Sequence, residues 1–275
     1  MTWRVFVIIG AENRDGTMSD VKRRGVAWLS SVLLLVVGCE TAPITGRSQV
    51  MLLSEGQEGQ MGQEAYQEIL KKAKISTDPA LNDQVTRVGR RIAQATGKNY
   101  AWQFTVIEDK QVNAFCLPGG KVAVYTGILP ITRDDAGLAA VLGHEVAHAV
   151  ARHGAERVSQ QVGVNVLLTG LQVGLGGNPA LAQQVTALLG AGATVGVLLP
   201  WSRTQESEAD HLGLIYMAKA GYHPSAAKEL WVRMEAAARG QPKPPEFLST
   251  HPSEATRITQ IEAWLPEALR YYQPR

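Results

Sequence analysis

Apolar and polar positions repeat with the period of a helix over most of the chain after residue 50, and with the period of a strand over one short region. The helical rhythm predicts helices over residues 54–74, 79–96, 139–151, 212–218, 225–239 and 254–265. Alternation of apolar and polar residues over 102–107 predicts a half-buried strand, and two further runs, 112–115 and 121–126, flank a turn at 118–120. The pattern predicts an α+β fold that is mainly α-helical, with a small antiparallel β-sheet beside the 139–151 helix.

Capping residues predict where some of these helices begin and end. Ser54, followed three residues later by Gln57, is a capping box, in which the two residues satisfy each other's backbone N–H groups. Thr132 with Asp135 is a similar signal ahead of the 139–151 helix. Gly154 follows that helix and is expected to end it.

The 139–151 helix contains the pattern His-Glu-x-x-His at His144, Glu145 and His148. Residues four apart lie on one face of a helix, so both imidazoles can bind one metal ion. Glu145 is adjacent to the first of them and can take a proton from a metal-bound water as a general base. The alternative is a helix with two solvent-facing histidines, and the apolar flanking residues argue against it.

A catalytic zinc ion usually has three protein ligands and leaves the fourth position to water. Glu206 and Asp210, four residues apart, share a helix face ahead of the apolar run 212–218. Glu206 is therefore the candidate third ligand, and Asp210 the group that holds a ligand histidine in place. Spacing alone leaves open an acidic, solvated helix start. Glu208 points elsewhere, and His153 is interpreted as a cation that complements the dipole at a helix end.

Composition narrows the function classes. The chain has 275 residues, of which 45% are hydrophobic and 19% charged, as in an ordinary globular protein with a substantial core. The net charge is +2, and no basic stripe with interleaved aromatic residues occurs, so a nucleic-acid partner is not expected.

The N-terminus has the composition of a targeting signal. Three basic residues precede the apolar run 26–37, which is too short to span a bilayer comfortably. The run ends in Val-Val, and Gly38 and Cys39 follow. These four residues together resemble a bacterial lipobox, so cleavage before Cys39 would leave a lipid-bearing cysteine. Residues 1–38 are then a lipoprotein signal peptide, for which a start at Met18 instead of Met1 would give a normal length, and 39–53 a lipidated tether ahead of a single domain. An uncleaved signal anchor is the alternative.

The apolar, Gly- and Ala-rich segment 162–200 is interrupted by polar residues. A transmembrane hairpin needs about 20 clean apolar residues in each pass, and neither half of the segment supplies them. A helical hairpin that covers the active site is predicted instead.

Four segments, in order along the chain, resemble the HtpX/Ste-type (CAAX-protease-like) zinc metallopeptidases, a gluzincin family with His-Glu-x-x-His and a later Glu-x-x-Ala-Asp. They are residues 113–122, 144–148, 202–210, and 249–252 with Arg257. The chain resembles the bacterial periplasmic lipoprotein branch in particular. The resemblance implies a zincin-like metallopeptidase domain over residues 54–270, one Zn²⁺ per chain, and Glu206 as a ligand. Cys116 departs from the small apolar residue usual in relatives, away from the metal site.

The resemblance also implies further roles. Arg257 resembles the arginine that stabilises the oxyanion of the transition state, and His251 resembles a residue that can occupy the fourth zinc position as a ligand or plug. The alternative for both is a plain helix start at Pro252. In such peptidases an edge strand of the sheet binds the substrate by strand addition. The candidates are Asn113, Ala114, Val122 and Val124.

The resulting expectation is a zinc-dependent endopeptidase, lipid-anchored on the periplasmic side of a bacterial membrane, with Glu40 after Cys39 favouring the outer membrane. Its partners would be the membrane, reached through the lipid, and unfolded or misassembled envelope proteins that it hydrolyses in quality control. The alternative is a non-proteolytic outer-membrane assembly factor or chaperone-like lipoprotein, with a zinc site closed by His251. Glu145 favours catalysis, since a structural zinc ion needs no neighbouring base.

Overall fold

The computed structural model describes residues 38–174, 199–239, 245–251 and 256–274. The predicted signal peptide up to residue 37 and the middle of the predicted 162–200 hairpin lie outside these ranges. Within them, none of the helices combines the length and the apolar composition that crossing a bilayer requires.

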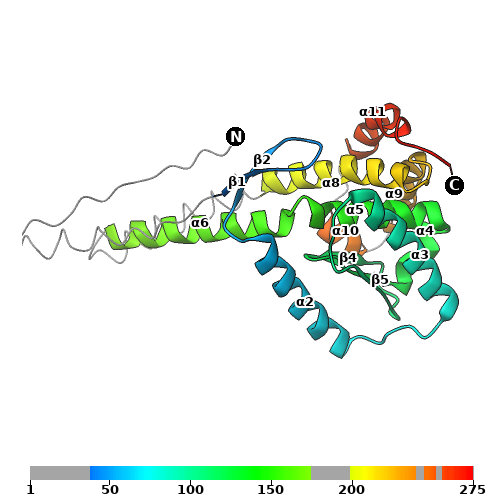
Figure 1. Ribbon diagram of the computed structural model, residues 1–275, viewed down its shortest axis with the longest axis horizontal. Helices are drawn as coiled ribbons and strands as arrows, with labels where there is room; N and C mark the ends of the chain where they lie inside the picture. The colour runs from blue at the N-terminus through cyan, green and yellow to red at the C-terminus, as the bar shows by residue number, and fades with distance from the viewer. Residues whose placement is uncertain (1–37, 175–198, 240–244, 252–255, 275) are drawn as a thin grey trace, which may run out of the picture. The chain divides into compact units, whose positions relative to one another are not determined.

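Helices make up most of the described chain, with a two-stranded and a three-stranded sheet (Figure 1). In chain order the elements are β1 (Gly38–Thr41), β2 (Ser48–Met51), α2 (Glu55–Lys72), α3 (Pro79–Thr96), β3 (Gln103–Ile107), β4 (Ala114–Leu117), β5 (Lys121–Tyr125), the 3-10 helix η1 (Thr126–Ile128), α4 (Leu129–Thr132), α5 (Asp135–Val150), α6 (His153–Gly174), α8 (Leu199–Lys219), α9 (Ser225–Ala238), α10 (Glu246–Thr250) and α11 (Arg257–Leu269). The predicted α+β, mainly helical class is confirmed.

The three-stranded sheet has the order β3-β5-β4, so β5 is its central strand. β4 and β5 form an antiparallel hairpin around the predicted turn, where Gly119 and Gly120 have φ angles of 76° and 81° that favour glycine. β3 runs parallel to β5, where an antiparallel neighbour was expected. The reason is the chain path: after β3 it crosses to the far edge, and the hairpin then returns it to the centre alongside β3.

The two faces of this sheet belong to two apolar clusters because side chains alternate along a strand. Val122 and Val124 of β5 lie in the main core, together with residues of α3, α5 and α8. Ala123, between them, belongs to a smaller cluster with Tyr66 of α2. Helices therefore cover both faces of the sheet, and the face with α5 points toward the main core.

The ends of α5 differ from their prediction. The N-cap is Asp134, whose side chain accepts from the backbone N–H of Gly137 at 2.8 Å, whereas Thr132 ends the preceding short helix. Gly154 does not end α5 and lies in α6. The break comes earlier, at Arg152, which has a φ of 60°. Its guanidinium bonds Glu58 of α2, and these buried contacts hold a backbone conformation that non-glycine residues rarely adopt.

α5 is the central helix of the core and crosses α8 at two glycines. A Cβ atom on Gly213 of α8 would lie 2.9 Å from the backbone N of His144, and one on Gly143 would lie 2.9 Å from the carbonyl O of Gly213. The two backbones therefore approach more closely than any residue with a side chain would allow. This contact sits directly beside the His-Glu-x-x-His pattern.

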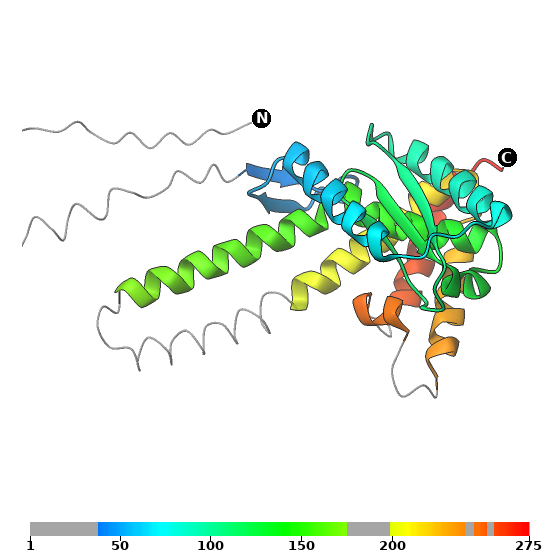
Figure 2. The same cartoon turned by 90° about the horizontal axis from the view of Figure 1, so that it is seen from below.

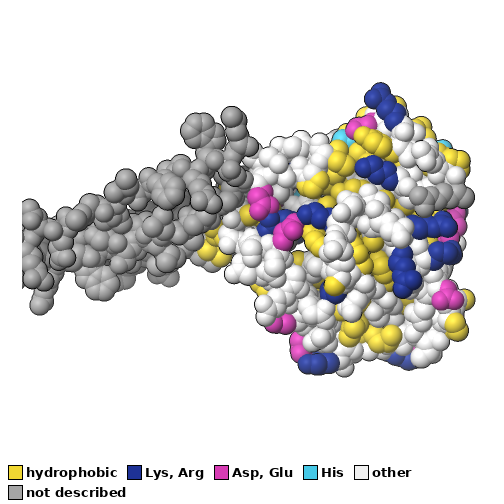
Figure 3. Space-filling view, viewed as in Figure 1, with side chains coloured by type: hydrophobic (Ala, Val, Ile, Leu, Met, Phe, Trp, Pro, Cys, Tyr) yellow, Lys and Arg dark blue, Asp and Glu magenta, His cyan; other side chains and the backbone are white. Residues whose placement is uncertain are grey.

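α6 and α8 lie side by side next to this crossing (Figure 2). Arg157 of α6 donates to Gln205 of α8 at 2.7 Å, and Gln205 donates to Glu156 at 2.7 Å. On the face shown in Figure 3, acidic and basic side chains are interspersed with apolar ones.

Gly213→Ala is expected to destabilise the fold. The added methyl group meets backbone atoms of α5, and such overpacking costs about 1–3 kcal/mol, which exceeds the gain of up to about 1 kcal/mol in helix propensity. The measurement is thermal unfolding followed by circular dichroism. Gly163→Ala in α6 is the matched control, because no atom of the described residues lies within 4 Å of its Cβ position. It should raise the melting temperature, and an equal rise in Gly213→Ala would contradict the tight crossing.

Candidate metal centre and active site

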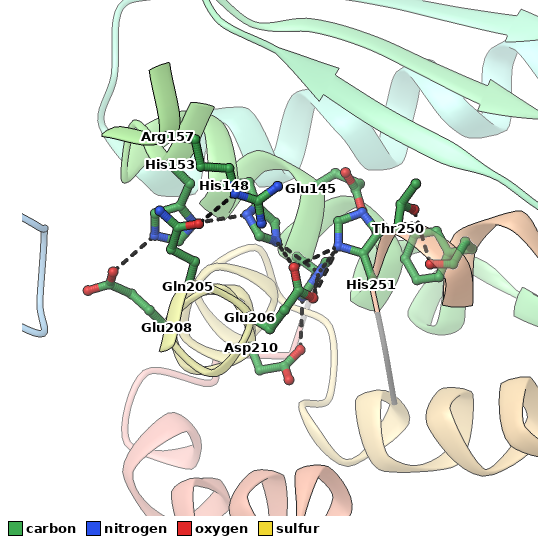
Figure 4. A network of polar contacts seen from close by, with 12 residues as sticks. Glu145, His148, His153, Arg157, Gln205, Glu206, Glu208, Asp210, Thr250 and His251 are labelled. Carbon is green, nitrogen blue, oxygen red and sulfur yellow. Dashed lines mark hydrogen bonds and ion pairs between the residues drawn. The ribbon is translucent and has the colours of Figure 1, made fainter. Parts of the chain in front are cut away.

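Four side chains with metal-ligand atoms gather in one place: His144 and His148 from α5, Glu206 from α8, and His251 directly after α10. Figure 4 shows His148, Glu206 and His251 pointing toward one another. These atoms all lie within 4.8 Å of one another. The four-residue spacing places the first two on one face of α5. The fold brings the other two from distant parts of the chain, so the three candidate ligands and the candidate plug form one cluster.

The distances between the ligand atoms of His144, His148 and Glu206 are close to those of a zinc coordination tetrahedron. Zinc bonds to N and O of about 2.0–2.1 Å place neighbouring ligand atoms about 3.3 Å apart. Nε2 of His148 lies 3.1 Å from Nε2 of His144 and 3.2 Å from Oε1 of Glu206. Nε2 of His144 lies 3.4 Å from Oε2 of Glu206 and 3.1 Å from Nδ1 of His251. Imidazoles with one carboxylate are also the donor set of a catalytic zinc ion, so the residues fit this metal.

Glu145, the candidate general base, is buried beside the cluster, with 3% of its surface exposed. Its Oε1 atom has no hydrogen-bond partner within the described part of the chain, and Nε2 of His251 is 3.4 Å away. Burial raises the pKa of Glu145, and the charges of His251 and His144 only partly offset this. A buried carboxylate with a raised pKa and an available acceptor atom suits proton transfer.

Asp210 bonds the ring of His144, as expected from the sequence. Its Oδ1 atom lies 2.9 Å from Nδ1 of His144, the nitrogen that points away from the cluster. Arg257 of α11 pairs with the same carboxylate, with Nε at 2.6 Å from Oδ2 and Nη2 at 2.8 Å from Oδ1. The guanidinium of Arg257 also lies 3.4 Å over the ring centroid of Trp231 in α9. These contacts hold a buried arginine at the edge of the cluster, where its Nη2 is 3.4 Å from Glu206.

The charges of the cluster favour metal binding. Burial lowers the pKa of His144, but Asp210 and Glu206 outweigh this effect and raise the pKa to about 9. Burial also raises the pKa of Glu206, yet the charge of His148 and the hydrogen bonds of the histidines lower it overall. Burial holds the pKa of His148 well below its usual value. Glu206 is thus held in the ionised form that binds a metal, whereas His144 has to release its proton on binding.

His148 also has a buried partner at Nδ1, the ring nitrogen that does not belong to the cluster. This partner is His153, which no sequence pattern assigned to the site. Nδ1 of His153 lies 2.8 Å from Nδ1 of His148, and Nε2 of His153 lies 2.9 Å from Oε2 of Glu208 (Figure 4). The interpretation of His153 as a cation at a helix end is wrong, because it begins α6, is 2% exposed, and has a pKa that burial lowers. The break at Arg152 turns it back toward α5, and helical periodicity could not predict that turn.

Two residues of the connection between β1 and β2 donate hydrogen bonds to Glu208. Arg47 donates to Glu208 at 2.8 Å and to Glu156 of α6 at 2.6 Å, and the hydroxyl of Thr45 also donates to Glu208. Burial raises the pKa of Glu208, but the bonds from His153, Thr45 and Arg47 outweigh it and lower the pKa to about 2. No sequence pattern pointed to Arg47, since a single arginine so far from the motifs carries no signal.

Only part of the predicted substrate strand has an available edge. Val122 and Val124 lie in β5, whose backbone pairs with β3 on one side and β4 on the other, so their assignment to an edge strand is wrong. Ala114 begins β4, which is an edge of the sheet, and Asn113 directly precedes it. β4 also packs against α5, the helix that carries the cluster.

Comparison with known proteins identifies the family. The family model described as peptidase family M48 matches residues 78–265. The chain belongs to this family. It is a zinc metalloendopeptidase, as the motif predicted, and the family implies a metal cofactor.

Mitochondrial and bacterial relatives both match this M48 peptidase. The mitochondrial metalloendopeptidase OMA1 of Schizosaccharomyces pombe is 42% identical over 235 residues, which is 83% of this chain and 67% of the relative. The protein of the same name from Saccharomyces cerevisiae is 32% identical, over 85% of this chain and 71% of the relative. The putative beta-barrel assembly-enhancing protease of Vibrio cholerae is 31% identical, over 77% of this chain and 44% of the relative. The family is therefore shown, but not the HtpX/Ste-type lipoprotein branch.

These relatives overturn the predicted location, which was the periplasmic side of a bacterial membrane with the outer membrane favoured. The relative with 42% identity is named a mitochondrial protein, as are those of budding yeast, cattle and humans. A short apolar run behind basic residues is only a compositional pattern. Such a pattern does not by itself identify the compartment to which a protein is sent. Lipidation of Cys39 stays a prediction, since the structure describes this residue only as a backbone position of β1.

Replacing a candidate ligand should remove the metal. His144→Ala and Glu206→Ala each take away one of three protein donors, so purified protein should lose most of its zinc. Inductively coupled plasma mass spectrometry measures the content, expected at about one zinc per chain for the parent. His211→Ala is the control, because His211 lies on α8 with Glu206 but bonds Glu267 at 2.8 Å. Full metal retention in Glu206→Ala would move the third ligand elsewhere.

Proposed function

We propose that this M48 peptidase is a zinc-dependent endopeptidase that hydrolyses misfolded or misassembled membrane proteins in quality control. The observation that carries the catalytic part is the cluster of His144, His148 and Glu206 with the buried Oε1 atom of Glu145 beside it, which has no hydrogen-bond partner among the residues that the structure describes. A structural site needs ligands alone, whereas an adjacent base with a raised pKa serves a reaction.

In this proposal His144, His148 and Glu206 hold one zinc ion, which when bound polarises the scissile carbonyl and acidifies water. Glu145 accepts the proton of the attacking water at its carboxylate and delivers it to the nitrogen of the leaving amine. Burial supports both steps because it raises the pKa of Glu145. A carboxyl group whose pKa is nearer the working pH gains and loses a proton more readily. Asp210 keeps the ring of His144 in its ligand orientation.

Arg257 is proposed to stabilise the oxyanion of the tetrahedral intermediate. Its guanidinium is held in place by Asp210 on one side and by the ring of Trp231 beneath it. A preorganised cation stabilises developing negative charge without having to reorient during the reaction. The distance of 3.4 Å between Nη2 and Glu206 supports a position at the edge of the cluster.

The substrate is proposed to bind as an added strand along β4. Asn113 and Ala114 lie at the start of this edge, where an extended peptide can form main-chain hydrogen bonds. Such binding recognises backbone rather than side chains, so it suits unfolded polypeptides of varied sequence. The names of the Vibrio cholerae and Escherichia coli relatives, which refer to beta-barrel assembly, support membrane proteins as the substrate class.

His251 is proposed to occupy the fourth metal position in a resting state. Its Nδ1 atom lies 3.1 Å from Nε2 of His144 and 3.1 Å from both carboxylate oxygens of Glu206. A fourth protein ligand there would exclude the attacking water and keep basal proteolysis low. The same contacts favour the second candidate function, a non-proteolytic assembly factor with a permanently closed zinc site.

Glu145→Gln should keep the metal and lose peptidase activity. The amide preserves the shape but cannot accept the proton, and general-base catalysis contributes about 10²- to 10⁴-fold to a rate. Cleavage of casein with and without a chelator, together with zinc content, measures both properties. Glu229→Gln on the exposed face of α9 is the control and should leave both unchanged. Undiminished cleavage by Glu145→Gln would rule out the mechanism, and chelator-insensitive cleavage would rule out the metal.

His251→Ala should raise basal casein cleavage, because it opens the fourth position while the three other ligands remain. Zinc content should stay at the parent level. His223→Ala, which removes an exposed histidine outside the cluster, should change neither quantity. If His251→Ala loses activity with fold and metal intact, His251 binds the substrate or the transition state instead. If both the parent and this variant are inactive on unfolded substrates, the non-proteolytic alternative is favoured.

A further inference from the structure

The side of His148 that faces away from the cluster is part of a buried chain of hydrogen bonds. Nδ1 of His148 meets Nδ1 of His153 at 2.8 Å, and Nε2 of His153 meets Glu208 at 2.9 Å. His153 is 2% exposed and Glu208 5% exposed, so water does not compete for these bonds. The three residues come from α5, α6 and α8.

Metal binding would determine which atom donates in each of the hydrogen bonds from His148 through His153 to Glu208. On the proposed function, Nε2 of His148 must present a lone pair to the zinc ion, so the proton of the neutral imidazole sits on Nδ1. That N–H can only donate to Nδ1 of His153, whose own proton must then sit on Nε2. From there it donates to the carboxylate of Glu208, which can only accept.

Glu208 is itself held from outside the helices. Arg47 donates to it through Nη2 at 2.8 Å and through Nε at 3.0 Å, and Thr45 donates through its hydroxyl. Both residues lie between β1 and β2, and the same arginine also bonds Glu156 of α6. The carboxylate is therefore fixed in position, with its oxygens placed to accept the hydrogen bond of His153.

We propose that His153 and Glu208 are positioning residues for the metal: they fix the tautomer and ring orientation of His148, and Arg47 in turn holds Glu208. The proposal rests on the assignment of His148 as a ligand. His144 is oriented in a similar way but without an intervening imidazole, since Asp210 lies 2.9 Å from its Nδ1 atom. Each candidate histidine ligand of α5 is thus oriented by a carboxylate of α8, one directly and one through an intervening imidazole. This pattern makes the β1–β2 connection a functional part of the metal centre.

The test is zinc affinity, measured on the full chain by competition with a chromophoric chelator. His153→Ala removes the acceptor of the His148 N–H group, and loss of such an orienting partner typically weakens metal binding about 10- to 100-fold. His153→Asn restores an acceptor oxygen near the position of Nδ1 without reaching Glu208, so it should recover part of the loss. The visible absorption of the cobalt-substituted protein reports the ligand geometry and should change in His153→Ala.

His211→Ala and Glu267→Gln are matched controls. They break another histidine–carboxylate hydrogen bond of 2.8 Å, between α8 and α11, that does not touch a candidate ligand. Both should bind zinc as the parent does. If His153→Ala binds zinc as tightly as the parent, or if His211→Ala weakens binding equally, the positioning role is wrong.

Two further variants separate the possible failures. Glu208→Ala removes the acceptor of the His153 N–H group, and it carries the test if His153→Ala does not fold, with parent-like affinity again overturning the proposal. His148→Ala should abolish tight zinc binding. If it does, but the His153 and Glu208 variants bind normally, only the positioning role fails. If His148→Ala itself binds zinc tightly, the proposed function has the wrong ligand set.

Discussion

The close crossing of α5 and α8 is the constraint on which the rest of this M48 peptidase depends. Gly143 and Gly213 let the two backbones approach to a distance that a single methyl group would prevent. Two acidic side chains of α8 can therefore reach the imidazoles of α5. Glu206 does so within the cluster and Asp210 on the far side of His144. A wider crossing would leave these carboxylates buried away from their partners, at a cost that apolar packing elsewhere could hardly offset.

Nearly every charge near the crossing has a close, oppositely charged or hydrogen-bonding partner, as burial requires. Asp210 faces both His144 and Arg257, and Glu208 faces His153 and Arg47. Glu145 has the weakest contacts, since its Oε1 atom has no hydrogen-bond partner in the described ranges and lies 3.4 Å from Nε2 of His251. An incompletely satisfied buried carboxylate is common for catalytic groups, which agrees with the proposed role of Glu145.

The centre also depends on elements that are remote in sequence and make no apolar core of their own. His251 arrives after the short helix α10, and Arg257 begins α11. The β1–β2 connection reaches Glu208 from the other end of the domain. Phe247 of α10 and Ile261 of α11 belong to the main core, so packing against that core holds both helices in place beside the centre.

The sequence by itself determined the local features: the helix with His144 and His148 four residues apart and Glu145 next to the first, the capping box at Ser54, the glycine turn before β5 and the mainly helical class. These follow from periodicity and backbone preferences within a few residues. Only the tertiary structure decided which distant residues meet, namely His153 and Arg47 behind the centre, the central place of β5 and the parallel pairing of β3. Such contacts depend on how helices and strands pack and where the chain turns, and the turn at Arg152 is stabilised by α2, which no local pattern reveals.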